Sequence, residues 1–102
     1  MPGVIINSGC KIGENVFLNT GCIIEHDCII ENNVFLSPGV ILSGRVKIKS
    51  NSFVGTGTII STGIVVGNNV TIGTGSVVVK DVPDNVTIFG NPAHNNLIEK
   101  FN

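Results

Sequence analysis

Aliphatic residues recur at every sixth position of the chain from Ile6 to Val78 without a break in register. They are Ile6, Ile12, Leu18, Ile24, Ile30, Leu36, Leu42, Ile48, Val54, Ile60, Val66, Ile72 and Val78. A second register, two residues earlier, is small or apolar from Val4 to Val82. A third, three residues after each aliphatic, holds Gly, Asn or Asp except at Arg45. Because side chains alternate across a strand and Gly, Asn and Asp turn a chain readily, each hexad predicts a short strand and a corner.

A six-residue repeat of this kind is typical of a parallel β-helix, in which stacked units bury an apolar core that no unit could bury alone. The two apolar registers lie two residues apart, so both face the inside. The period fails at position 84, where Asp84 stands. We therefore expect one all-β domain over residues 1–102, with repeats over about 4–83 and a closing segment over 84–102.

Composition narrows the classes of partner. The 102 residues are 42% hydrophobic and 13% charged, so a partner surface must cover part of so apolar a chain. A net charge of −1 disfavours nucleic acid or an anionic membrane as partner. No apolar run is as long as a membrane-spanning helix, and Met1 leads straight into the first hexad without a signal peptide, so we expect a cytoplasmic protein.

Three cysteines, Cys10, Cys22 and Cys28, all occupy the small inward register. A buried thiol there acts as a small apolar side chain, so we interpret all three as structural. Their odd number and the expected reducing compartment favour free thiols, although Cys10 and Cys28 would lie one coil apart.

Several segments resemble a known family. The end, with Lys80-Asp81-Val82-Pro83 and then Gly90-Asn91-Pro92-Ala93, is similar to the end of many hexapeptide acyltransferases. The run from Leu18 to Val40 resembles the sialic acid O-acetyltransferase and nucleotide-sugar N-acetyltransferase branch, without its amino-terminal domain. The resemblance implies a left-handed β-helix of about 4 coils, with three hexads and eighteen residues in each coil.

Eighteen-residue coils place outward residues in columns. One face would carry five aliphatics and another an aromatic ladder, while the third mixes lysines with Ile29 and Val65. The two apolar columns are Ile5, Ile23, Ile41, Ile59 and Val77, and Phe17, Phe35 and Phe53. Large apolar patches mark interfaces, and pairing two different faces closes a ring of three if each subunit is rotated by a third of a turn. We therefore expect a homotrimer, which the resemblance also implies.

His26 is the strongest candidate for acid–base chemistry. It stands in Glu25-His26-Asp27, outward at a corner, where Asp27 could hold one ring nitrogen protonated and leave the other as a base. In the resembled branch, the histidine of this segment is the proposed general base and the acid beside it orients the ring. Many members of that branch have a second histidine at the position of Phe35, so a two-histidine mechanism is not expected here. We expect His94 to be exposed and non-catalytic.

Acetyl-CoA is the implied acyl donor, with an amino or hydroxyl group of a sugar or nucleotide-sugar as the acceptor. Gly44 stands eighteen residues after His26, and its N–H could donate to the thioester oxygen and to the oxyanion that follows. Thr62 and Lys80 continue that column, and Lys80 could meet the CoA phosphates. At Gly57 and Gly75, the backbone could approach the pantetheine arm.

Other functions remain possible for this pattern. The chain could be a non-catalytic trimeric scaffold, or a fragment of a larger acetyltransferase. A carbonic anhydrase on this fold needs three zinc-binding histidines, and the chain has two, so we expect no metal. An ice-binding helix would show outer threonine ladders, whereas these columns carry Ile and Phe.

Overall fold

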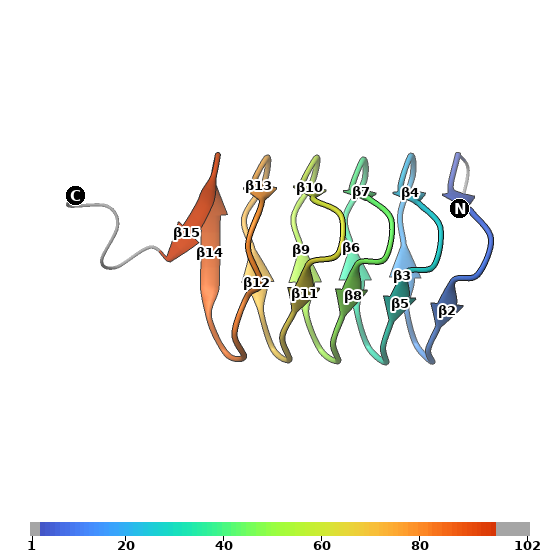
Figure 1. Cartoon of the computed structure of the whole chain (residues 1–102), viewed down its shortest axis with the longest axis horizontal. Coiled ribbons are helices and arrows are strands. Elements are labelled where there is room, and N and C mark those ends of the chain that lie inside the picture. The colour runs from blue at the N-terminus through green and yellow to red at the C-terminus, as the bar shows by residue number, and fades with distance from the viewer. Residues whose placement is uncertain (1–2, 96–102) are drawn as a thin grey trace.

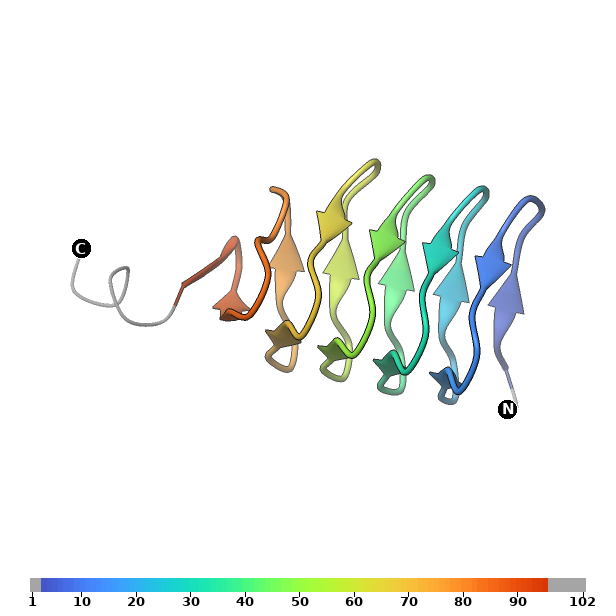
Figure 2. The same cartoon turned by 90° about the horizontal axis from the view of Figure 1, so that it is seen from below.

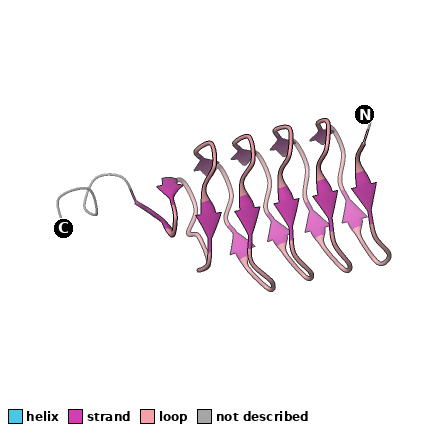
Figure 3. Cartoon of the chain, turned by 90° about the horizontal axis from the view of Figure 1, so that it is seen from above, coloured by secondary structure: helices cyan, strands magenta, loops and turns pink. Residues whose placement is uncertain are grey.

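The computed structural model describes residues 3–95, in which every regular element is a strand (Figure 3). Each of the thirteen hexads folds as a two-residue strand whose second residue is the periodic aliphatic. The strands are β1 (Ile5–Ile6), β2 (Lys11–Ile12), β3 (Phe17–Leu18), β4 (Ile23–Ile24), β5 (Ile29–Ile30), β6 (Phe35–Leu36), β7 (Ile41–Leu42), β8 (Lys47–Ile48), β9 (Phe53–Val54), β10 (Ile59–Ile60), β11 (Val65–Val66), β12 (Thr71–Ile72), β13 (Val77–Val78), β14 (Thr87–Gly90) and β15 (Ala93–Asn95).

The chain winds as a left-handed parallel β-helix, as expected, and successive strands pass to three different sheets in turn (Figures 1 and 2). We call the sheets A (β1-β4-β7-β10-β13), B (β11-β8-β5-β2) and C (β15-β14-β12-β9-β6-β3). Ile5 pairs with Ile23, and Ile23 with Ile41, which confirms eighteen residues per coil. The outward columns predicted from the sequence are therefore real neighbours along each sheet.

The third register forms the corners. From Gly9 to Gly75 every residue of this register has a left-handed backbone, Arg45 included, with φ of 60°. Gly, Asn and Asp adopt this conformation at little cost, which explains their choice. Asp81 is the exception, because its φ is not positive.

The last coil is shorter than the others. Val77 still pairs with Ile59 eighteen residues back, but Val82 bridges Val66, only sixteen residues back. The corner between them therefore lacks two residues, which explains both the ordinary φ of Asp81 and the loss of period at position 84. Strand β14, within the expected closing segment, pairs in parallel with β12 and continues a fifth turn.

Strand β15 pairs antiparallel with β14 and covers its free edge. This strand lies in the closing segment, or tail, that was expected over residues 84–102. Residues 96–102 of the tail lie outside the described part of the chain.

The core fills the tube between the three sheets with the two inward registers. Ten of the thirteen periodic aliphatics are at most 1% exposed, and so are several small residues, among them Cys22, Cys28 and Val34. Three of the buried hydroxyls donate hydrogen bonds to backbone oxygens: Ser52 to Gly67 at 2.7 Å, Thr58 to Gly73 at 3.2 Å and Ser76 to Gly73 at 2.7 Å. No polar side-chain atom buried among residues 3–95 lacks a partner.

The first coil is the open end of the core. Ile6 and Ile12 belong to the inward register, yet they are 48% and 37% exposed because no other coil of the described residues covers them. Outward residues of sheets A and C are also exposed, with Ile59 and Phe53 each at 41%. Within residues 3–95 there is no helix long and apolar enough to cross a membrane.

Candidate active site

His26 and Asp27 lie at the corner where the chain leaves sheet A after β4 and enters sheet B at β5. Their side chains are half exposed, at 50% and 61%. Asp27 takes the left-handed conformation of the corner, with φ of 60°. Its Oδ2 lies 3.1 Å from His26 Nδ1, within hydrogen-bond distance. When Nδ1 carries the proton and donates to Asp27, the other ring nitrogen, Nε2, is left as an acceptor.

Asp27 is held from the coil below. Its backbone N–H donates to the Ser8 carbonyl at 3.0 Å. Its Oδ1 fills the space in which a side chain on Gly9 would stand. The glycine therefore leaves room for the carboxylate to turn toward the imidazole.

Gly44 lies in the coil above, against the ring of His26. A methyl carbon on Gly44 would lie 2.5 Å from His26 Nε2 and 2.7 Å from Cε1. The coils of His26 and Gly44 are joined here, because Arg45 N–H donates to the His26 carbonyl at 2.9 Å. The next coil is joined in the same way, by Gly63 N–H donating to the Gly44 carbonyl at 3.0 Å. No oxygen among the described residues accepts a hydrogen bond from the Gly44 N–H. The basic nitrogen and an unused backbone donor thus stand at one corner.

Thr62 continues the column one coil further on, as predicted, and is exposed at the same corner. Lys80 does not continue it in register, because the corner that contains it is the one shortened by two residues. Lys80 instead lines a hollow of about 410 Å³ at the C-terminal end of the helix, together with Pro83 and His94. His94 is exposed, as expected, and packs edge-on against Phe89 with ring centres 6.2 Å apart.

Gly57 and Gly75 lie at a different corner, where the chain passes from sheet C to sheet A. Both have the positive φ that the corner requires, 72° and 70°. Five residues of roughly extended chain separate this corner from that of His26, or about 16 Å. Within one chain the structure therefore does not bring these glycines together with His26 and Gly44.

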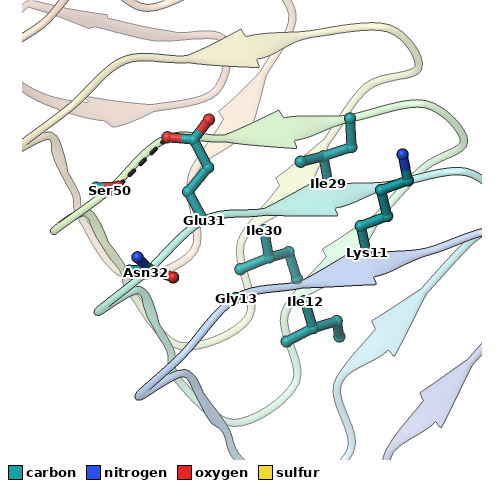
Figure 4. A pocket seen from close by; sticks show the side chains of 8 residues that line it. All are labelled: Lys11, Ile12, Gly13, Ile29, Ile30, Glu31, Asn32 and Ser50. Atoms are coloured by element: carbon teal, nitrogen blue, oxygen red, sulfur yellow. Dashed lines mark hydrogen bonds between the residues drawn. The ribbon is translucent and has the colours of Figure 1, made fainter.

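A second hollow, of about 320 Å³, opens on sheet B near the first coil (Figure 4). Lys11, Ile29 and Glu31 stand around it, and Glu31 accepts a hydrogen bond from Ser50 at 3.3 Å. Neither hollow includes His26. The His26 side chain of a single chain is half exposed, so a binding cleft that encloses it would need a second wall.

Two further groups lie outside the His26 corner. Phe35 is the middle ring of a ladder on sheet C, with its centre 5.8 Å from that of Phe17 and 5.3 Å from that of Phe53.

Burial raises the pKa of the Cys28 thiol, which disfavours the thiolate that a nucleophile requires. Residues 3–95 contain no group of three or more His, Cys, Asp or Glu side chains that could hold a metal ion.

Comparison with known families supports the repeat. A model described as bacterial transferase hexapeptide (six repeats) matches residues 9–44. A second, described as hexapeptide repeat of succinyl-transferase, matches residues 45–80 directly after it. The chain belongs to the hexapeptide-repeat transferases. No curated protein matched the sequence.

Solved structures similar to this hexapeptide-repeat chain are acetyltransferases. A histidine variant of perosamine N-acetyltransferase from Caulobacter crescentus, in complex with CoA and GDP-perosamine, is 35% identical with a TM-score of 0.91 over 93% of this chain and 45% of that one. The acetyltransferase domain of PglB from Neisseria gonorrhoeae is 34% identical, with a TM-score of 0.84 over 92% and 55%.

A third structure extends the range of acceptors. A maltose O-acetyltransferase from Clostridium difficile is 36% identical, with a TM-score of 0.79 over 90% of this chain and 63% of that one. The hexapeptide-repeat chain spans about half the length of the perosamine N-acetyltransferase and PglB structures described above.

Proposed function

We propose that this chain carries the catalytic corner of an acetyl-CoA-dependent acetyltransferase, with His26 as general base. The observation that carries the proposal is the corner itself. His26 is hydrogen bonded to Asp27 through Nδ1, and its Nε2 lies against Gly44, whose N–H has no acceptor among the described residues. A base and an oxyanion donor side by side are what acyl transfer requires.

In the proposed reaction His26 Nε2 removes the proton of the acceptor amine or hydroxyl as that group attacks the thioester carbonyl of acetyl-CoA. Gly44 N–H donates to the carbonyl oxygen as it gains negative charge, which stabilises the tetrahedral intermediate. Asp27 keeps the ring oriented and stabilises its positive charge. When the C–S bond breaks, His26 returns the proton to the departing CoA sulfur. No enzyme-bound acyl group forms, in accord with the burial of Cys22 and Cys28.

The proposed acceptor is a sugar or a nucleotide-sugar. Perosamine N-acetyltransferase was solved with CoA and GDP-perosamine, and the similar maltose enzyme is an O-acetyltransferase. Similar folds therefore serve both amino and hydroxyl acceptors. The His26 corner suits either, because a neutral imidazole can take a proton from both.

The second wall of the cleft is proposed to come from another copy of the chain in a homotrimer. Sheets A and C expose columns of aliphatic and aromatic side chains to solvent, including Ile59 and Phe53, and apolar patches of this kind mark interfaces. Packing sheet A of one copy on sheet C of the next is heterologous, and it closes after three copies when each copy is rotated by a third of a turn. Acetyl-CoA in that cleft is proposed to contact Gly44, Thr62 and Lys80, whereas Gly57 and Gly75 lie at the opposite edge of sheet A.

The test is calorimetric titration of the purified chain with acetyl-CoA and CoA, with its molar mass measured by light scattering. We expect a trimer that binds about one ligand per chain. Amino and hydroxyl sugars are then screened for acetylation, with His26→Ala as the control, which should remain trimeric and bind acetyl-CoA without turnover. A trimer that binds no CoA at millimolar concentration would overturn the proposal and favour a non-catalytic scaffold.

A further inference from the structure

The choice of glycine at position 44 has no backbone explanation. The corresponding residue of every other hexad from Ser8 to Thr74 carries a side chain, Thr62 in the next coil included. Gly44 is not in the left-handed region, unlike the corner glycines Gly9 and Gly63. The conformation is therefore open to any residue, and a glycine here gives up the lower unfolded-state entropy that a side chain would provide.

The space beside Gly44 is filled by His26. A methyl carbon on Gly44 would lie 2.5, 2.7 and 3.1 Å from ring atoms Nε2, Cε1 and Cδ2. These are three of the five ring atoms, so the methyl would meet the imidazole broadly and a small shift would not relieve the overlap. The backbone bond from Arg45 to the His26 carbonyl, at 2.9 Å, prevents the two coils from moving apart.

We propose that Gly44 is a positioning residue for the general base, because the missing side chain lets the imidazole of His26 lie across the corner with Nδ1 at Asp27 and Nε2 toward the substrate. This inference rests on the function proposed above. It is distinct from donation by the Gly44 N–H, since an alanine would keep that donor. It predicts that one added methyl group displaces the ring and breaks its contact with Asp27.

The test compares Gly44→Ala with Gly13→Ala, two single-methyl additions at glycines outside the left-handed region. At Gly13 the methyl would meet the side-chain oxygen of Asn32 and, at 3.0 Å, backbone atoms of Glu31 and Asn32, at the far edge of sheet B from His26. Wild-type protein should show magnetisation transfer between the His26 ring protons and the Gly44 α protons by NMR. Gly44→Ala should change the ring nitrogen shifts of His26, whereas Gly13→Ala should leave them as in the wild type.

Kinetics give the second readout. Gly44→Ala should lower kcat about 10- to 100-fold, the scale of loss from misplacing a catalytic group by about 1 Å, with the KM for acetyl-CoA unchanged. Gly13→Ala should keep the wild-type kcat. Unchanged ring shifts and kcat in Gly44→Ala, or no contact between the ring and Gly44 in the wild type, would overturn the inference. If His26→Ala keeps full activity, the proposed function itself fails, which is a separate result.

Discussion

The carboxylate of Asp27 lies 3.1 Å from the Nδ1 atom of His26, and both side chains are at least half exposed to water. An exposed pair of this kind contributes little to stability, typically under about 1 kcal/mol. Its orienting effect on the ring does not depend on that stability. A substitution at this pair can therefore lower activity without lowering the stability of the fold.

Replacing Asp27 by Asn tests this separation. The amide cannot stabilise the charged imidazole, so kcat should fall by about two orders of magnitude or less, while the melting temperature stays near that of the wild type. Activity is measured by release of free CoA, and melting by circular dichroism. A large loss of stability would show that Asp27 has a structural role instead.

The predicted homotrimer is tested by replacing each of two similarly exposed isoleucines with a charged residue. Ile59 on sheet A and Ile29 on sheet B are 41% and 37% exposed, but only sheet A belongs to the proposed interface. Ile59→Glu should give a smaller species in light scattering, because a carboxylate would be buried without a partner. Ile29→Glu should remain trimeric. The opposite pattern would place the interface on sheet B.

Thiol reactivity should follow burial. Cys10, in the open first coil, is half-buried, whereas Cys22 and Cys28 are buried. Iodoacetamide should alkylate Cys10 first in the native protein, and the other two only after unfolding, as mass spectrometry would show. Early modification of Cys28 would contradict its position in the core.

The raised pKa of the Cys28 thiol, caused by burial, also predicts a pH dependence of stability. The folded state keeps this proton to higher pH than the unfolded state, so the contribution is full below the unfolded pKa of about 8.5 and is lost as pH rises above it. Urea unfolding between pH 7 and pH 10 measures the loss. Cys28→Ala should weaken the dependence, and an identical slope in this variant would rule out Cys28 as its source.

Arg45 is the one corner residue of the repeat that is not Gly, Asn or Asp, yet it has φ of 60°. Because Asn tolerates this conformation better than Arg, Arg45→Asn should raise the free energy of unfolding by about 0.5 to 1 kcal/mol. The reverse change at an equivalent corner, Asn51→Arg, should lower it by a similar amount, since Asn51 has φ of 64°. Urea unfolding at one protein concentration gives both values, and equal stabilities would contradict the assignment of strain.

The sequence alone was sufficient for the coil and its columns. The six-residue period predicts short strands with both apolar registers inside, and the family resemblance implies eighteen-residue coils, which fix which residues stack, such as Ile23 on Ile5. It was not sufficient for the last coil, which is two residues shorter between Val78 and Val82. Lys80 therefore lies out of the column of His26, although the eighteen-residue spacing predicts that it belongs there.

The sequence could select His26, Asp27 and Gly44 as a set, since spacing and resemblance both pointed to one corner. Only the tertiary structure decided how they fit together. The direction in which the ring of His26 lies depends on what occupies the coils on either side, and there the missing side chains of Gly9 and Gly44 leave the space that the carboxylate and the imidazole fill. Such contacts join residues eighteen positions apart and depend on shape at the scale of a single methyl group, which a period in the sequence does not encode.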